Sequence, residues 1–93
     1  MIKSFADKRT AAVFREQPAK GVGDAVARSA KRKLDLLHAA VRVEDLLSPP
    51  GNRLEKLRGD RAGQWSIRVN DQWRICFRWD GRNAQDVVLA DHP

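Results

Sequence analysis

Apolar and polar positions alternate with a period of two through most of the last third of the chain. Within residues 64–69 the tryptophan, the isoleucine and the valine share one parity. Within residues 73–79 the two tryptophans, the isoleucine and the phenylalanine do the same. Such alternation is typical of a β-strand with one buried face. The pattern therefore predicts two neighbouring strands joined by a short turn.

The length of that turn determines which side chains lie opposite one another. A two-residue loop would pair Ile67 with Arg74 and mix apolar and basic side chains on both faces. A three-residue loop over 70–72 pairs Val69 with Trp73 and Ile67 with Ile75, which keeps one face apolar. Because the buried face sets the register of a strand pair, we predict the three-residue loop.

This register places Arg68 directly opposite Arg74 on the polar face, with Arg78 further along the second strand. Like charges that face each other destabilise a sheet. Unless neighbouring acidic side chains relieve the repulsion, the three arginines indicate a bound anion.

Two segments in the first half of the chain have the apolar spacing of helices. In residues 8–16 we expect Asp7 to cap the helix, and Thr10, Val13 and Phe14 to share its buried face. In residues 24–41 apolar side chains recur at intervals of three and four, which places them on one stripe of a second helix. That stripe consists of Val26, Ala30, Leu34, Leu37 and Val41.

Three further strands complete the predicted order. Residues 2–5 alternate briefly and predict a first strand at a sheet edge. Residues 53–57 predict a strand that ends early or contains a bulge, because Leu54 and Leu57 differ in parity. Residues 86–90 predict an apolar final strand. The order β-α-α-β-β-β-β predicts an α+β fold in which two helices pack on a mainly antiparallel sheet.

The composition is that of one small folded domain over residues 1–93. A content of 42 % apolar and 32 % charged residues excludes a disordered chain. No signal peptide and no apolar run of membrane length is visible. The single cysteine, Cys76, excludes an internal disulfide, and no Cys/His cluster has zinc-ligand spacing. We therefore expect a cytoplasmic protein with no metal, no other cofactor and no membrane partner.

The net charge of +6 arises from 18 basic and 12 acidic side chains. An excess of this kind favours nucleic acid as a partner, because phosphate contacts release condensed counterions. The alternative explanation is solubility. The placement of the charge along one strand face favours nucleic acid.

The residues that remain as candidates for chemistry fit metal-free cleavage of RNA. In that reaction the 2′-hydroxyl attacks the adjacent phosphorus, cations stabilise the developing charge, and a base and an acid move protons. Arg58, Arg74 and Arg78 would hold the phosphate, and Asp91 or His92 would move a proton. The alternative is that Arg53, Arg68 and Arg78 are solvated residues paired with Glu55 or Asp60, and that the terminal Asp-His is a polar tail.

Several segments, taken together, resemble the HigB toxins of the RelE superfamily, also called plasmid maintenance system killer proteins. The similar segments are Arg53-Leu-Glu-Lys-Leu-Arg-Gly-Asp60, Gly63-Gln-Trp-Ser-Ile-Arg-Val-Asn70, Trp73-Arg-Ile-Cys-Phe-Arg-Trp79 and the N-terminal Ile2-Lys-Ser-Phe-Ala-Asp-Lys-Arg-Thr10. The resemblance implies a microbial-RNase-like fold and an endoribonuclease that cuts translated mRNA in the ribosomal A site. It also implies a helix-turn-helix antitoxin, HigA, and operator DNA that is bound mainly through that antitoxin.

The resemblance also implies site residues by position. Arg58 stands at the basic place of the family's Leu-Lys-Gly-Asp element, and Arg74 at the arginine of its Asn-x-x-Trp-Arg element. Asp91 matches the aspartate of a terminal Asp-Tyr-His, whereas this chain has Asp91-His92-Pro93. Either His92 substitutes for the Tyr-His pair, or the chain is a weak or altered nuclease.

The leading hypothesis is therefore a ribosome-dependent mRNA endonuclease toxin with Arg58, Arg74, Asp91 and His92 in its active site. Contacts with RNA or the ribosome are expected from Arg53, Lys56, Arg68, Asn70, Arg78, Lys31 and Arg32. The alternative hypothesis is a basic RNA-binding or ribosome-binding partner with little or no nuclease activity, which acts in an antitoxin-containing, DNA-bound repressor complex.

Overall fold

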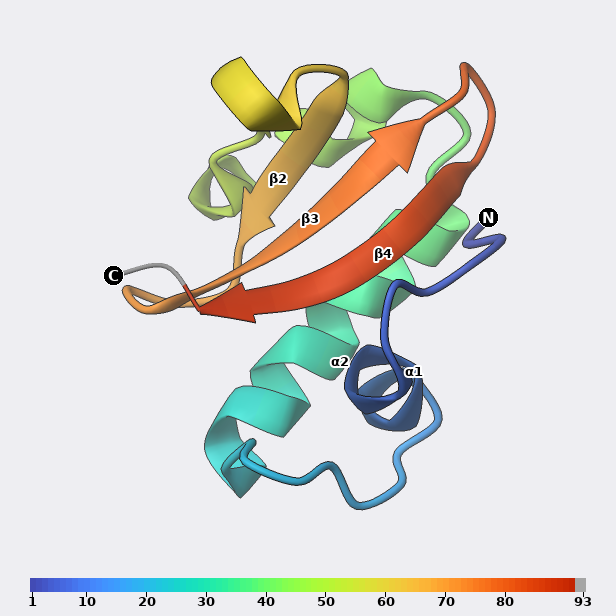
Figure 1. The fold of residues 1–93 in the computed structure, drawn as a ribbon. Helices are drawn as coiled ribbons and strands as arrows, with labels where there is room; N and C mark the ends of the chain where they lie inside the picture. The colour runs from blue at the N-terminus through green and yellow to red at the C-terminus, as the bar shows by residue number, and fades with distance from the viewer. Residues whose placement is uncertain (92–93) are drawn as a thin grey trace.

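A computed structural model describes residues 1–91 as two layers, a four-stranded antiparallel sheet and two helices that cover one of its faces (Figure 1). The helices are α1 (Lys8–Phe14) and α2 (Asp24–Ala39). The strands, in the order β1-β2-β3-β4, are β1 (Glu55–Lys56), β2 (Gln64–Arg68), β3 (Trp73–Trp79) and β4 (Ala84–Asp91). Short 3-10 helices lie at Val43–Leu47 (η1), Pro50–Asn52 (η2) and Gly59–Arg61 (η3). The predicted α+β fold is confirmed.

The two helices begin at their predicted first residues, Lys8 and Asp24, and end earlier than expected. The Asp7 carboxylate accepts a hydrogen bond from the Thr10 N–H at 2.8 Å. Helix α1 ends at Phe14, before Glu16 takes a left-handed φ of 57°. Helix α2 ends at Ala39 because Ala40 is extended. The predicted place of Val41 on the buried stripe is therefore wrong, and Val41 is 72 % exposed.

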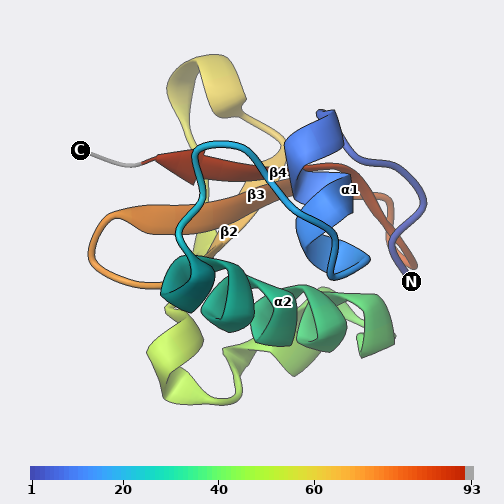
Figure 2. The ribbon, with the colours of Figure 1, turned by 90° about the horizontal axis from the view of Figure 1, so that it is seen from below.

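The register of β2 and β3 is the one that the alternating pattern predicts. Trp65 pairs with Phe77, Ile67 with Ile75, and Arg68 with Arg74. The three-residue turn is closed by two hydrogen bonds from the N–H groups of Gln72 and Trp73 to the Asn70 side chain, at 2.8 and 2.7 Å. Ile67, Ile75 and Phe77 of this pair of strands are fully buried in the core, and Trp65 and Trp79 pack against it. Figure 2 shows α2 lying across one face of the sheet.

The predicted first and second strands, at 2–5 and 53–57, are much reduced. Residues 2–5 lie along β4 in parallel, but they form only two isolated bridges, between Ile2 and Ala84 and between Phe5 and Val87. The strand predicted at 53–57 consists of Glu55 and Lys56 alone, since Arg53 has a left-handed φ of 45°. The sheet therefore has four strands, and the N-terminal segment covers part of the outer edge of β4.

The last strand starts two residues before its predicted beginning and contains a bulge. The β3–β4 register shifts between Cys76 and Arg78, so that one additional residue lies on β4. Asp86 sits in that stretch with φ 52°. A left-handed residue at this point is typical of a β-bulge, which turns side chains away from strict alternation. Further along, the Thr10 hydroxyl accepts from the Leu89 N–H at 2.9 Å, so α1 caps the strand edge there.

The turn between β3 and β4 is stabilised by Asp80. Its carboxylate accepts hydrogen bonds from the N–H groups of Asn83 (2.7 Å) and Arg82 (2.9 Å) and from the Gln85 side chain (2.8 Å). These bonds, led by the one from Asn83, hold the pKa of Asp80 below the ordinary value of 3.8. The ionised carboxylate is therefore favoured in the folded state.

A lowered pKa predicts a defined dependence of stability on pH. Asp80 contributes to the free energy of unfolding above pH 3.8, and this contribution is lost as pH falls through its lower folded-state pKa. We expect Asp80→Asn to be less stable than wild type at neutral pH, and the difference to shrink below pH 3.8. Urea unfolding at several pH values measures this, with Asp60→Asn as a control in an exposed turn. A difference that stays constant with pH would contradict the assignment.

No helix within residues 1–91 is long and apolar enough to cross a lipid bilayer. Within the same range, no three His, Cys, Asp or Glu side chains come together as a possible metal site.

Candidate active site

The face of the sheet opposite the helices is polar, and its side chains come from β1, β2 and β3. Arg74 pairs across the sheet with Arg68, Cys76 with Ser66, and Arg78 with Gln64. Two of these polar-face residues are nevertheless buried, Ser66 at 0 % and Cys76 at 6 % exposed. The small side chains of Ser66 and Cys76 are therefore buried beneath longer side chains, which include arginines.

Arg74 is the most firmly held side chain of this face. Its Nε donates to the Ser66 hydroxyl at 2.9 Å, and its Nη2 donates to the Arg53 carbonyl at 2.9 Å. The side chain is only 14 % exposed. An arginine has five N–H donors, so the two nitrogens engaged here leave further donors for a ligand. The guanidinium is therefore fixed in place by neutral acceptors while it keeps its charge available.

Cys76, buried on this face, is influenced by two arginines. Burial raises the pKa of the Cys76 thiol, while the positive charges of Arg61 and Arg74 and a hydrogen bond from Arg61 oppose that rise. The neutral thiol is thus favoured, although the charges of Arg61 and Arg74 act on it. Arg61, from η3, is a site residue that the sequence analysis did not identify.

Each of the three arginines Arg68, Arg74 and Arg78 has an acidic neighbour. The inference of a bound anion, which assumed that these arginines have no acidic partners, is therefore corrected. Arg68 pairs with Asp71, Arg78 Nε lies 3.3 Å from Asp86, and Arg74 Nη2 lies 3.6 Å from Glu55 Oε2. Repulsion among the arginines therefore does not require a bound anion. The acids are more than half exposed, and such pairs contribute only about 0 to 1 kcal/mol each. A phosphate group can replace them at small cost.

The pairing partners also differ from those expected. The alternative in which Arg53, Arg68 and Arg78 are solvated and paired with Glu55 or Asp60 is right about pairing for Arg68 and Arg78 but wrong about the acids. Glu55 contacts Arg74 instead. Arg53 acts through its carbonyl, which holds Arg74.

Arg58 lies in the exposed turn that follows β1, immediately before η3. Its neighbour Leu57 donates a backbone hydrogen bond to Gln64 at 2.8 Å. Arg74 contacts Ser66, two residues further along the same strand. Arg58 therefore follows the residue opposite Gln64, at the end of β2 that pairs with Arg78, whereas Arg74 pairs with Arg68 at the other end of β2.

Asp91, in contrast, does not share the face of Arg74. It pairs with Trp73 at the end of β4, whereas Arg74 pairs with Ala90. Residues that pair directly lie on the same face of a sheet, so Asp91 lies on the side of Trp73 and of the helices. Its carboxylate accepts from the Gln72 amide at 3.3 Å. His92 lies outside the described residues.

The other predicted RNA-binding residues divide between several surfaces. Lys56 pairs with Trp65 and places its Nζ 5.6 Å from that ring, so it belongs to the face opposite Arg74. Asn70 uses its side-chain oxygen to close the β2–β3 turn. Arg53, Arg68 and Arg78 lie on or beside the open face; Arg53 and Arg78 are exposed, and Arg68 is partly buried.

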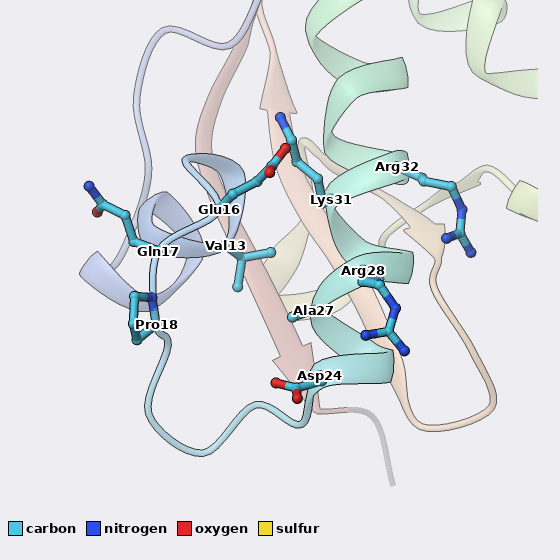
Figure 3. Close-up of a pocket in the computed structure, with 9 residues that line it drawn as sticks. All are labelled: Val13, Glu16, Gln17, Pro18, Asp24, Ala27, Arg28, Lys31 and Arg32. Carbon is cyan, nitrogen blue, oxygen red and sulfur yellow. The ribbon is translucent and has the colours of Figure 1, made fainter.

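Lys31 and Arg32 lie on α2, in the helical layer. They line a groove of about 620 Å³ between α2 and the end of α1 (Figure 3). Lys31 pairs with Asp35 at 2.7 Å, and Arg32 donates to the Ser29 hydroxyl at 3.2 Å. Glu16 and Asp24 give this groove mixed charge. Lys31 and Arg32 therefore lie on a different surface from Arg74, and the three residues do not form a single nucleic-acid surface.

The protein is similar to toxins of bacterial toxin–antitoxin systems. A family model described as the RelE-like toxin of the type II toxin–antitoxin system HigB matches residues 3–92. The protein named Toxin HigB-1 from Vibrio cholerae is 48 % identical over 61 residues, which cover 66 % of this chain and 64 % of that protein. The Endoribonuclease HigB of Proteus vulgaris is 33 % identical over 92 residues, 99 % of each chain.

An uncharacterized protein of Haemophilus influenzae is 38 % identical over 61 residues, 66 % of this chain and 60 % of that protein. The matched segment thus spans less than two thirds of the length of the Vibrio and Haemophilus relatives, whereas the match to the Proteus protein is end to end.

Proposed function

The chain belongs to the HigB-like family of RelE-like toxins of type II toxin–antitoxin systems, and from this premise we propose that it is an endoribonuclease that cuts translated mRNA on the ribosome. The observation that carries the proposal is the held guanidinium of Arg74 on the open face of the sheet. The printed name of the Proteus relative supports an RNA-cleaving activity.

Arginines supply the electrostatic part of the proposed reaction. Cleavage develops negative charge on the phosphate oxygens, and fixed positive groups aimed at those oxygens stabilise the transition state. Arg74 is already oriented by Ser66 and Arg53, so little further ordering is needed. Arg58, which lies toward the other end of β2, would bind the RNA from the solvent side, and Arg68, Arg78 and Arg53 would contact the adjoining backbone.

The C-terminal pair has two separate roles in this proposal. Asp91 lies on the opposite face from Arg74, so we assign it to positioning the end of β4 rather than to proton transfer. His92 is proposed as the acid that protonates the leaving oxygen, because imidazole changes charge near neutral pH.

The proposed partners follow from the family. A toxin of a type II system acts with an antitoxin, here a HigA-like helix-turn-helix protein that would bind operator DNA on behalf of the pair. The substrate-bearing partner is the translating ribosome, which places the protein in the cytoplasm.

The decisive experiment is to map the 5′ ends of cellular mRNA after brief expression of the toxin without its antitoxin. We expect cuts within coding regions, in frame, because the ribosome presents codons one at a time, together with arrest of growth. His92→Ala should give fewer cuts. Growth arrest without any mRNA cuts, or no growth arrest at all, would contradict the proposed nuclease activity. The alternative hypothesis, a non-catalytic RNA-binding partner in a repressor complex, would then remain.

A further inference from the structure

Asn52, the last residue of η2, has a polar side chain that is fully buried. Its Nδ2 donates to the carbonyls of Leu46 at 3.2 Å and Ser48 at 3.3 Å, and its Oδ1 accepts a hydrogen bond from the Lys33 ammonium. Both amide donors and the amide oxygen are therefore engaged. The side chain thus ties η2 to η1 and to α2 in the helical layer.

Arg53, the next residue, is the one whose carbonyl accepts a hydrogen bond from Arg74 Nη2 at 2.9 Å. Its backbone is left-handed, with φ 45° and ψ 55°. A non-glycine residue rarely adopts this conformation and keeps it only where the surrounding structure holds it. The Asn52 N–H donates to the Pro49 carbonyl at 2.9 Å. The Arg53 N–H donates to the Pro50 carbonyl at 3.1 Å. The direction of the Arg53 carbonyl therefore depends on the tight turn that Asn52 anchors.

The Arg53 carbonyl supplies the second of the two hydrogen bonds that orient the Arg74 guanidinium. The bond from Nε to the Ser66 hydroxyl fixes one point of this planar group, and a second point is needed to fix its direction. The Glu55 carboxylate does not supply it, because its Oε2 lies 3.6 Å from Nη2, too far for a good hydrogen bond. Without the Arg53 carbonyl, the guanidinium would be free to turn toward Glu55.

We propose that Asn52 is a positioning residue for Arg74, which acts through the Arg53 carbonyl. The inference rests on the proposed function, in which Arg74 is the cation that meets the phosphate. Asn52 is buried and touches no substrate. Its role is to keep the carbonyl aimed at Arg74 Nη2, so that the guanidinium is oriented before the RNA arrives.

Two substitutions of Arg53 test the carbonyl link. Arg53→Gly and Arg53→Val remove the same side-chain charge, but glycine adopts a left-handed backbone readily whereas a β-branched residue does not. We expect Arg53→Val to cut mRNA about 10- to 10²-fold more slowly than Arg53→Gly in single-turnover reactions on programmed ribosomes, because a displacement of about 1 Å costs up to about 10²-fold. Equal rates for the two variants would overturn the proposal.

A double substitution tests whether Asn52 acts through Arg74. Asn52→Ala alone should slow cleavage by about 10- to 10²-fold. In the Arg74→Ala background it should change the rate by less than about threefold, because substitutions that remove the same interaction are not additive. An equal loss in both backgrounds would contradict the assignment. Val87→Ala, which truncates a fully buried side chain of β4, is the control for lost stability and should cut like wild type while it is folded.

Hydrogen exchange separates the position of Arg74 from the cleavage reaction. The side-chain N–H hydrogens of Arg74, identified by NMR from the signals lost in Arg74→Ala, should exchange with solvent faster in Asn52→Ala than in wild type. Unchanged exchange would overturn the proposal. If Asn52→Ala does not fold, Asn52→Asp replaces it, since it keeps the shape and the acceptor for Lys33 but loses both donors. If wild type cuts no mRNA, the proposed function fails, and the exchange rates alone decide whether Asn52 positions Arg74.

Discussion

Replacing Arg74 by alanine is expected to slow mRNA cleavage by about 10²- to 10³-fold, the usual effect of removing one preorganised donor to a developing charge. The guanidinium is the only group of the described open face that combines full charge, 14 % exposure and two hydrogen bonds to neutral acceptors. Single-turnover cleavage on programmed ribosomes measures this loss. Arg74→Lys should recover little, because lysine lacks the planar set of donors that reaches Ser66 and Arg53 together.

Arg74→Ala also leaves the buried Ser66 hydroxyl without its hydrogen-bond donor, so the stability of this variant must be measured in parallel. A group of this kind that loses its partner costs about 1–3 kcal/mol. Rates should therefore be compared well below the unfolding temperature of each variant. Arg82→Ala removes an equal charge from the exposed β3–β4 turn and should leave cleavage unchanged. An Arg74→Ala enzyme that cuts within about threefold of wild type would place the phosphate elsewhere.

The β2–β3 pair shows what the sequence can predict. Trp65, Ile67 and Val69 on one strand had to face the apolar members of the next, and only a three-residue turn satisfied both. The opposition of Arg68 and Arg74 followed from the same parity. These features depend on neighbouring residues alone, which is why they were predicted correctly.

The ion pairs of the open face depend on irregular backbone that has no such pattern. Asp86 reaches Arg78 from a bulge at which its φ is 52°. Arg53, with φ 45°, turns its carbonyl toward Arg74. Neither conformation is indicated by apolar periodicity, so the acids that neutralise the arginines could not be assigned from the sequence. The end of α2 is a similar case, since Val41 fits the helical stripe by spacing alone.

The separation of Asp91 from Arg74 also depends on that bulge. The sequence predicted an apolar strand over 86–90 but gave no register for it. The additional residue between the pairs of Cys76 and Arg78 sets which side chains of β4 lie on each face. With that register known, Asp91 pairs with Trp73 and lies with the core. Glu55, two residues after Arg53 in a strand of only two residues, takes its place beside Arg74.

Strand β3 carries the core on one face and the proposed chemistry on the other, and Phe77 tests whether the two can be separated. Its side chain is fully buried, and its ring contacts Trp79 edge-on at 6.4 Å. Phe77→Ala should lower the free energy of unfolding by about 3–5 kcal/mol through lost burial and the cavity left behind. In a domain of this size each 1 kcal/mol shifts the unfolding temperature by about 4–8 °C.

The expected result of Phe77→Ala is therefore a large loss of thermal stability with near-normal cleavage at temperatures where the variant remains folded. The physical reason is that Cys76 and Arg78 on either side of Phe77 face the open side, and Arg74 keeps its contacts with Ser66 and Arg53. Thermal unfolding and low-temperature cleavage measure the two effects, with the exposed Leu47→Ala as the control. Loss of cleavage in a folded Phe77→Ala protein would show that packing on the core side of β3 sets the position of Arg74. Stability and activity would then depend on the same packing.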